Sequence, residues 1–262
     1  MEIESRELGR LGGPVDFIKQ RVFLAAAWRK LVMFNYEVDP ALLRPLTPAG
    51  TELDFYDGAA ILSLVAFRFE NTRLVGVPVP GHMNFEEINL RFYVRRTERD
   101  GAIKRGVVFI KEIVPKPMLS LVARVFYNEQ YETYPASSHF ISDADDPERL
   151  LTLEYGWGNR RGSASVRVAT DGVRRPILPG TEEYSITQHF WGYAAQRDGG
   201  TMEYEVAHPV WNAWGVRSGV FQGDVSHIYG RTFQNILAGR PRSMFAVDGS
   251  EIAVFRGHRL PP

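Results

Sequence analysis

The sequence predicts a mainly β protein, in which an antiparallel sheet carries a few flanking helices. Side-chain character alternates with the two-residue period of a strand from Phe85 to Val94. Asp-Gly pairs, which supply the positive φ angles of tight hairpin turns, recur between β-rich runs. Helical patterns are confined to a few short segments. Together these three observations favour a β architecture.

The strand predicted at Phe85–Val94 has two chemically distinct faces. The apolar face carries Ile88, Leu90, Phe92 and Val94. The opposite face carries an acid, an amide, a guanidinium and a phenol: Glu87, Asn89, Arg91 and Tyr93. This series differs from the Lys, Thr and Ser mixture typical of a solvent-facing strand. It predicts a polar-lined pocket, with a solvated salt-bridge ladder as the alternative.

Four Asp-Gly pairs are each predicted to form a type I′ hairpin turn. The pairs are Asp57-Gly58, Asp100-Gly101, Asp171-Gly172 and Asp248-Gly249. The strands expected beside them are Leu53–Tyr56 and Ala60–Phe67, Leu90–Thr97 and Ile103–Ile113, Ser163–Ala169, and Phe245–Val247 with Ile252–Phe255. Four such turns indicate a mostly antiparallel sheet.

Three short helices are expected. Pro117–Phe126 opens with a proline at a natural first-turn position and carries an apolar stripe. Ser226–Leu237 places Phe233, Ile236 and Leu237 on one face and is followed by Gly239 as a stop signal. Pro40–Leu46 is the shortest candidate.

Composition narrows the classes of function. Lys and Arg number 31, and so do Asp and Glu, which argues against a nucleic-acid-binding protein. The absence of cysteine excludes disulfides, thiolate metal sites and cysteine nucleophiles, and fits a reducing compartment. The N-terminus lacks a signal-peptide pattern, and Arg29 and Lys30 interrupt the apolar run from Phe23 to Phe34. We therefore expect a cytoplasmic protein without membrane or nucleic-acid contacts.

The 262 residues are expected to form a single domain, because no segment resembles a flexible linker. Residues 1–20 are expected to be a loosely packed N-terminal segment. The acidic stretch Ser142–Pro147 is interpreted as a surface loop, since no calcium-loop spacing follows it. No phosphate-binding loop, dinucleotide fingerprint or nucleophile elbow is present, and no cofactor is predicted.

The hairpin around Asp100-Gly101 brings polar residues together. If these two residues form the turn, Arg99 pairs with Ala102, Asn89 with Glu112, and Arg91 with Ile110. Glu112 then shares a face with Glu87, Asn89 and Arg91, while Lys111 lies on the opposite face. Two carboxylates and a guanidinium held together in a partly buried site would perturb each other's pKa values, as acid–base chemistry requires.

Lys116 stands between Pro115 and Pro117. The following proline pushes its backbone towards an extended conformation, so that a rigid junction can aim the amine. A nucleophilic lysine also needs a lowered pKa, from desolvation or a nearby cation. Otherwise Lys116 is an ordinary loop lysine.

Three histidines invite a metal-site interpretation, because His189, His208 and His227 are evenly spaced along the chain. Even spacing does not create proximity. His189 and His208 lie beside Trp191, Trp211 and Trp214 in sequence, which favours aromatic packing with a polar tip. We expect no metal, and an aromatic cluster that can wall the pocket.

An ordered set of motifs across residues 20–258 resembles the YqjF-like family of domain of unknown function 2071. The central motif is Phe-x-Glu-x-Asn-Leu-Arg-x-Tyr-Val at Phe85–Val94. The others are Trp28-Arg29-x-Leu31, Asn35-Tyr36-x-Val38, Leu53-Asp54, Ser63-Leu64-Val65-x-Phe67, Arg105–Phe109, Ala123-Arg124 before Tyr131, Tyr184–Tyr193 and Glu205–Trp211.

That family is grouped with the acetoacetate-decarboxylase-like superfamily, so the resemblance implies an antiparallel β barrel or cone with an interior cavity. It also implies a Schiff base between a lysine and a β-keto acid. By the match to Glu112–Pro117, which is two residues shorter than the decarboxylase segment, Lys116 would be that lysine. Glu87 would be the pocket acid. Pro117 stands where the decarboxylases have the second lysine that lowers the first one's pKa.

The expected function is binding of a small carboxylate or oxo acid, with decarboxylase-like lyase chemistry through Lys116 left open. Glu87 and Glu112 are assigned acid–base or orienting work, and Arg91 or Arg124 the ligand carboxylate. The remaining predicted pocket residues are Asn89, Tyr93 and His189. The rivals are a ligand-binding or structural barrel without chemistry and a partner-interaction module, the latter with an exposed aromatic patch. The resemblance also leaves a homo-oligomer open.

Overall fold

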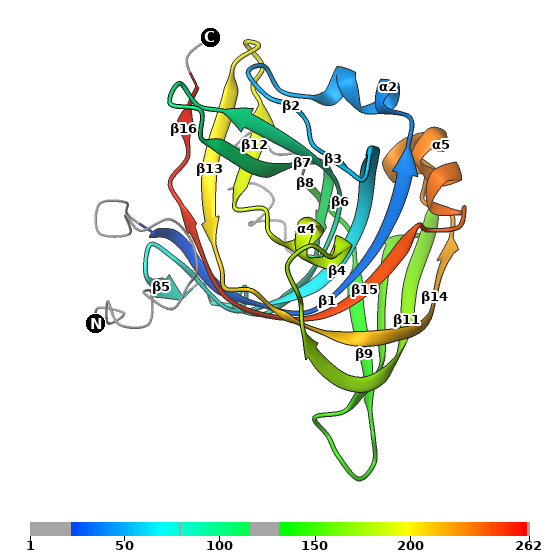
Figure 1. Cartoon of the computed structure of the whole chain (residues 1–262). Helices are drawn as coiled ribbons and strands as arrows, with labels where there is room; N and C mark the ends of the chain where they lie inside the picture. The colour runs from blue at the N-terminus through cyan, green and yellow to red at the C-terminus, as the bar shows by residue number, and fades with distance from the viewer. Residues whose placement is uncertain (1–21, 79, 116–130, 261–262) are drawn as a thin grey trace.

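The computed structural model describes residues 22–78, 80–115 and 131–260 (Figure 1). The expected N-terminal segment 1–20 and the expected helix Pro117–Phe126 lie outside these residues. Two strands dominate the first half, β4 (Ala59–Leu74) and β1 (Val22–Val38), and they pair with each other along most of their length. The prediction of a mainly β fold is confirmed.

Sixteen strands form one sheet. Besides β1 and β4, they are β2 (Glu52–Leu53), β3 (Phe55–Tyr56), β5 (Val77–Pro78), β6 (Phe85–Thr97), β7 (Ile103–Val114), β8 (Tyr131–Thr133), β9 (Ala136–Ser142), β10 (Leu150–Asn159), β11 (Gly162–Pro176), β12 (Trp191–Ala195), β13 (Thr201–Ala207), β14 (Asn212–Gly223), β15 (Ser243–Phe255) and β16 (His258–Arg259).

The main path through the sheet runs β16-β13-β12-β7-β6-β4-β1-β15-β14-β11-β10-β9. Strand pairs are antiparallel except for β12 with β7 and β7 with β8. Figure 1 looks into the curled part of the sheet, with the short helix α4 (Glu182–Thr187) in the middle of the view. Only Val206–Val254 and Ala207–Ala253 join β13 to β15. The predicted barrel or cone is therefore a cone-like curled sheet and not a fully closed barrel.

The two faces of β6 serve two different cores, as its alternation predicts. Ile88, Leu90, Phe92 and Val94 belong to the larger apolar cluster, which also contains Tyr155 of β10. On the other face, Tyr93 joins a second cluster that includes Met33 and Phe67. The extension β14-β11-β10-β9 thus covers the outside of the cone, and the polar face of β6 is directed to the inside.

Two of the four Asp-Gly pairs join strands. Asp57-Gly58 connects β3 to β4, and both residues have positive φ, as a type I′ turn requires. At Asp100-Gly101, Glu98 pairs with Ala102, and Gly101 alone has positive φ. The β6–β7 connection is therefore a three-residue loop, and the predicted pairing of Arg99 with Ala102 is wrong.

The other two pairs lie inside long strands, so the predicted turns there are wrong. Asp171-Gly172 falls within β11, where the register against β14 shifts between Thr170 and Arg174. Gly249 falls within β15 and pairs with Arg29 of β1. Positive φ serves a strand irregularity as well as a hairpin turn, and the dipeptide alone does not distinguish them.

Helices α2 (Pro40–Leu43), η1 (Arg44–Leu46) and α5 (Ser226–Leu237) confirm two of the predicted helices. Leu237 is buried, and Phe233 and Ile236 pack against the larger core, as predicted. Gly230 adopts φ 78° and ψ 161° and kinks α5. The acidic stretch beginning at Asp143 forms the loop between β9 and β10, at the lower end of Figure 1.

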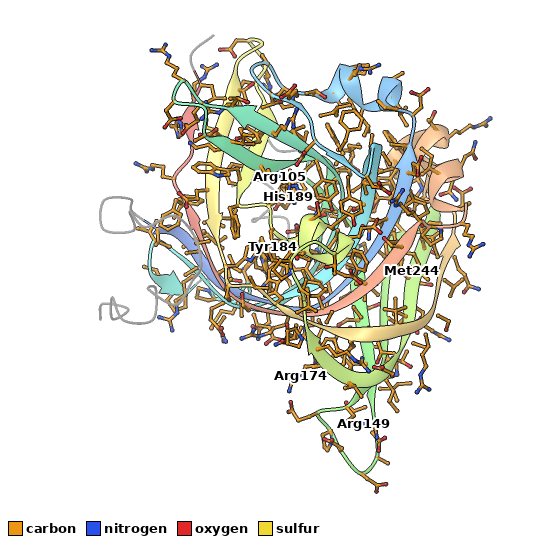
Figure 2. The ribbon with its side chains drawn as sticks, in the orientation of Figure 1. Arg105, Arg149, Arg174, Tyr184, His189 and Met244 are labelled. Carbon is orange, nitrogen blue, oxygen red and sulfur yellow. The ribbon has the colours of Figure 1, made fainter. Side chains whose placement is uncertain are left out.

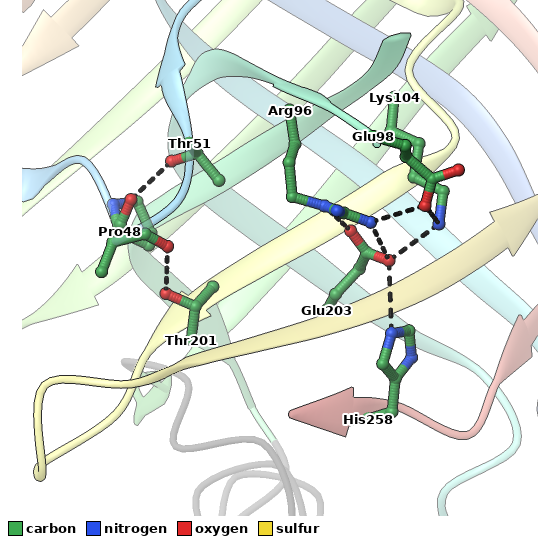
Figure 3. Close-up of polar contacts among 9 residues, drawn as sticks. Pro48, Thr51, Arg96, Glu98, Lys104, Thr201, Glu203 and His258 are labelled. Carbon is green, nitrogen blue, oxygen red and sulfur yellow. Dashed lines mark hydrogen bonds and ion pairs between the residues drawn. The ribbon is translucent and has the colours of Figure 1, made fainter. Parts of the chain in front are cut away.

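A buried ionic cluster holds the edge of the cone together (Figure 3). The carboxylate of Glu203 on β13 is fully buried, and it accepts hydrogen bonds from Arg96 of β6 at 2.6 Å and Lys104 of β7 at 2.9 Å. His258 of β16 lies 3.4 Å from the same carboxylate. Because β12 pairs with β7 over only two residues, this cluster supplies much of the attachment between β13 and the β6–β7 hairpin.

Within the part of the chain that the structure describes, no helix is both long enough and apolar enough to span a membrane.

Candidate functional site

A cavity of about 150 Å³ lies inside the cone. Its polar lining comprises Glu87, Arg91, Glu112, Tyr131, Thr187, His189, Tyr204 and His208. Its rings comprise Phe23, Trp28, Phe69, Phe85, Phe109, Trp191 and Trp211. A pocket with polar lining groups is thus present, and the rest of its lining is aromatic and aliphatic.

The β6–β7 hairpin places both acids and the guanidinium at this cavity. Asn89 pairs with Glu112, as predicted. Arg91 pairs with Phe109 and not with Ile110, because the register shifts by one residue between Leu90 and Arg91. The irregularity at Ile110 compensates for the extra loop residue at the turn. As a result, Phe109 and Glu112 both line the cavity, although they are three residues apart.

Glu87 lies in an apolar environment with two polar partners. Its side chain accepts a hydrogen bond of 3.1 Å from Asn89 Nδ2 and one of 3.2 Å from Tyr131 Oη. Burial raises the pKa of Glu87 to about 7, against the opposing effects of these hydrogen bonds and of the Arg91 charge. A carboxyl group with this pKa can both donate and accept a proton near neutral pH.

Glu112 is 2% exposed and pairs with Asn89, two residues along β6 from Glu87. Tyr131 of β8 pairs with Glu112 in register and donates its hydrogen bond to Glu87. Burial and the charges of Glu112 and Glu87 raise the pKa of Tyr131 well above its ordinary value. The phenol therefore stays protonated and acts as a fixed donor to the acids.

Arg91 contributes a positive charge to the lining of the cavity. Among the described residues, no carboxylate lies within 4.0 Å of its guanidinium, and its buried Nε has no hydrogen-bond acceptor. The guanidinium carbon lies 5.6 Å from the centre of the Tyr93 ring. A buried guanidinium with an unused donor is a suitable partner for a ligand carboxylate.

His189, labelled in Figure 2, follows α4 and lines the cavity. Its Nδ1 lies 3.2 Å from the carbonyl oxygen of Ile186, and its Nε2 lies 3.6 Å from Asp54 Oδ2. Asp54 is paired in turn with Arg105, at 2.9 Å. Burial lowers the pKa of His189, although Asp54 opposes that effect. His189 is therefore a neutral ring at physiological pH, connected through Asp54 to a surface arginine.

Tyr93 and Asn89 take part in the site indirectly. The Tyr93 ring contacts His189, with ring centres 4.6 Å apart, and faces a second small cavity beside Asp54. Its hydroxyl donates to Ser63 Oγ at 2.8 Å, and Ser63 donates to Asn35 Oδ1 at 2.6 Å. Neither Tyr93 nor Asn89 lines the main cavity, so they position His189 and Glu87.

The aromatic side of the cavity is built from stacked rings. His208 stacks on Trp211 with ring centres 4.3 Å apart, and Trp211 Nε1 donates to Ser250 Oγ at 2.8 Å. Burial lowers the pKa of His208 to about 4. The described residues contain no group of three or more side chains arranged to hold a metal ion.

Lys116 and Arg124, the predicted Schiff-base lysine and a predicted carboxylate ligand, lie outside the described residues. The described part of β7 ends at Val114, whose side chain lines the cavity two positions before Lys116 in the sequence. The roles assigned to these two residues stay predictions.

Sequence reasoning did not assign Tyr131, Trp28 or Asp54 to the site. Tyr131 reaches Glu87 through a parallel strand pair with β7, and no local spacing reveals such a contact. Trp28 and Asp54 both fall in motifs that carry the family resemblance, which was the signal available for them.

Comparisons with known proteins identify relatives of the chain. A protein of Bacillus subtilis strain 168, uncharacterized protein YqjF, is 33% identical over 120 residues. That match spans 45% of this chain and 48% of the relative, about half the length of each.

Solved structures share the fold at low sequence identity. Acetoacetate decarboxylase from Legionella pneumophila superposes with a TM-score of 0.57 and 13% identity, over 100% of this chain and 97% of that one. An acetoacetate decarboxylase-like enzyme from Sphingomonas wittichii RW1 has a TM-score of 0.62 and 13% identity, over 95% and 99%. The enduracididine biosynthesis enzyme MppR, complexed with pyruvate, has a TM-score of 0.63 and 14% identity, over 95% and 94%.

The family of uncharacterized conserved proteins DUF2071 matches residues 25–251, which include every described residue of the cavity except Phe23, Leu24 and Val254. Among the described lining residues, Phe23 and Leu24 precede the matched range and Val254 follows it. The chain therefore belongs to the DUF2071 family and has the fold of acetoacetate decarboxylase-like enzymes.

Proposed function

We propose that the protein binds a small carboxylate or oxo acid in the cavity of its cone. One observation carries this proposal: two buried acids converge on a mostly apolar cavity with a guanidinium that no carboxylate among the described residues pairs with. Burying such groups is costly unless they find partners, and a ligand carboxylate supplies the missing partner for Arg91.

We assign different roles to the polar residues at the cavity. Arg91 binds the ligand carboxylate, because its Nε lacks an acceptor among the described residues. Glu87 transfers a proton, since burial brings its pKa to about 7. Glu112, Asn89 and Tyr131 orient Glu87, and His189 faces the ligand as a neutral ring.

We further propose that Lys116 forms a Schiff base with the oxo group. Its amine attacks the carbonyl carbon, water leaves, and an iminium forms. For a β-oxo acid, the bond to the carboxylate then breaks and its electron pair moves to the iminium nitrogen as carbon dioxide leaves. Glu87 protonates the resulting enamine carbon, and hydrolysis releases the ketone and the free amine. The structure of MppR with pyruvate, a small oxo acid, is consistent with a ligand of this class in this fold.

The second candidate is binding without covalent chemistry. Pro117 favours it, because it replaces the neighbouring lysine that lowers the nucleophile's pKa in decarboxylases of the resembling family. In this case Arg91 and Glu87 still bind the acid, and Lys116 takes no part.

Trapping with borohydride separates the two candidates. The pure full-length protein is incubated with acetoacetate or pyruvate, reduced, and weighed intact by mass spectrometry. Schiff-base chemistry predicts a reduced adduct that maps to Lys116 and disappears in Lys116→Ala. Lys111→Ala is the matched control, because Lys111 pairs with Glu132 and does not line the cavity.

An adduct on Lys116 makes decarboxylase, aldolase and dehydratase assays worthwhile. Binding of the acids without any adduct selects the second candidate. If neither of these acids nor a larger oxo acid such as phenylpyruvate binds or forms an adduct, the cavity is not an oxo-acid site and the proposal fails.

A further inference from the structure

We infer that the ligand is a monocarboxylate with a ring-sized apolar group, such as an aryl-substituted oxo acid. This inference rests on the proposed function, because it assumes that the cavity binds a carboxylate. It goes further by specifying the rest of the molecule from the aromatic residues that line the cavity.

The first argument is the prebuilt aromatic wall. Trp28 lies edge-on to Phe69, with ring centres 6.0 Å apart, and edge-on to Trp211 at 6.3 Å. Trp211 is fixed by its hydrogen bond to Ser250. All three rings line the cavity. Rings held by one another form a rigid surface that favours a flat, apolar guest in edge-to-face or offset contact.

The second argument is size. The cavity has a volume of about 150 Å³. On the same measure of volume, a single water molecule needs roughly 10–15 Å³. Pyruvate or acetoacetate carries only a methyl group beyond its polar part. Such a ligand would fill the polar end and leave the aromatic wall uncovered. A phenyl or indole group attached to the same acid would cover it.

The third argument is charge. Arg91 is the cavity-lining cation among the described residues, and two acids, Glu87 and Glu112, share that lining. Among the described lining residues, a second anionic group on the ligand would therefore meet carboxylates, neutral polar groups or aromatic rings. This arrangement disfavours dicarboxylates and phosphorylated compounds and selects a single negative charge.

Calorimetric binding to the full-length protein tests the inference with pyruvate, 4-methyl-2-oxopentanoate, phenylpyruvate and 2-oxoglutarate. Each buried methylene strengthens binding about 4-fold. Phenylpyruvate should therefore bind at least about 30-fold more tightly than pyruvate, with 4-methyl-2-oxopentanoate between them. The dicarboxylate 2-oxoglutarate should bind more weakly than 4-methyl-2-oxopentanoate.

Two pairs of variants assign the effect to this cavity. Phe109→Leu should reduce the preference for phenylpyruvate over pyruvate about 5-fold, because one ring contact is lost. Phe140→Leu, a half-buried phenylalanine that does not line the cavity, should not change it. Arg91→Gln should weaken all four acids, whereas Arg95→Gln, whose partner is the exposed Glu52, should weaken none. Circular dichroism and thermal unfolding confirm that each variant is folded.

The outcomes separate the inference from the proposed function. If pyruvate binds as tightly as phenylpyruvate and both depend on Arg91, the cavity is an acid site but the aromatic specificity is wrong. If 2-oxoglutarate binds most tightly, the argument from charge is overturned. If none of the four acids binds, the proposed function fails and the inference fails with it.

Discussion

Glu87 concentrates the chemistry of the site in one side chain. It is 3% exposed, it shares its surroundings with Glu112, and its two hydrogen-bond donors are an amide and a phenol. Burial outweighs these donors and the nearby arginine, so the pKa of Glu87 rises to about 7. The charged form is therefore less stable in the folded protein than in the unfolded chain, where a glutamate has an ordinary pKa near 4.5.

This difference predicts a pH-dependent stability. Because the folded pKa is the higher one, the favourable contribution of protonated Glu87 is complete below about pH 4.5 and disappears as pH rises through about 7. Glu87→Gln should remove this loss, so that its free energy of unfolding at pH 8 exceeds that of the wild type. The gain should be on the order of 3 kcal/mol, and it should vanish near pH 4.5. Urea unfolding at both pH values measures it.

Thr187→Val is the control for this measurement, because Thr187 lines the same cavity without a titratable group. It should keep the wild-type change in stability between the two pH values. An unchanged pH dependence in Glu87→Gln would show that Glu87 ionises normally in the folded protein.

At the scale of elements, the β6–β7 hairpin shows how far the sequence leads. The alternation at Phe85–Val94 correctly predicts which side chains join the larger core, and Glu87 and Arg91 of the opposite face line the cavity. The pairing of Asn89 with Glu112 is also correct, although the turn beside it is a three-residue loop. A bulge at Ile110 of β7 restores the predicted register between β6 and β7. No local sequence pattern indicates this bulge. Such irregularities depend on packing between strands.

Gly249 provides a test of these strand irregularities. Its φ is +80°, and an added Cβ would lie 2.1 Å from the backbone oxygen of Trp28. Gly249→Ala should therefore cost about 2–4 kcal/mol of unfolding free energy, from backbone strain and overpacking combined. Gly58→Ala is the matched control, since its φ is +76° but nothing lies within 4 Å of the added Cβ. It should cost about 1 kcal/mol.

Denaturant unfolding of both alanine variants measures the difference. Equal losses would mean that the close approach of β1 to β15 at Gly249 relaxes without cost. Because Trp28 itself lines the cavity, Gly249→Ala should also weaken ligand binding, which Gly58→Ala should leave unchanged.

On the scale of the whole molecule, the cone depends on contacts that join distant strands. Residues far apart in the sequence meet at the cavity: Trp28 from β1, Glu87 from β6, Tyr131 from β8, His189 after α4 and Trp211 before β14. Composition and periodicity predict the strands but not this convergence. The polar face of Phe85–Val94 predicted a pocket, and the family resemblance predicted that it is an interior cavity. The sequence did not reveal Tyr131, whose hydroxyl donates a hydrogen bond to Glu87. That contact depends on the parallel pairing of β8 with β7.

The Glu203 cluster is the clearest long-range attachment of the cone. Although burial opposes ionisation, hydrogen bonds and charges from Arg96 and Lys104 hold the pKa of Glu203 below its ordinary value. Glu203→Gln leaves both cations without their buried counter-charge and should destabilise the protein by about 3 kcal/mol. Glu205→Gln is the matched control two residues along the same strand. Burial raises the pKa of Glu205, so its neutralisation should be neutral or stabilising.

Thermal and urea unfolding of the two glutamine variants tests this attachment. A destabilisation in Glu203→Gln no larger than that in Glu205→Gln would mean that the backbone pairing of β12 and β13 holds the cone by itself.

A crystal structure of the full-length protein with phenylpyruvate at saturating concentration tests the central claim most directly. The account predicts electron density inside the cone, with the carboxylate within hydrogen-bonding distance of Arg91 and the ring against Trp28 and Trp211. An empty cavity, or phenylpyruvate bound only elsewhere on the protein, would contradict it.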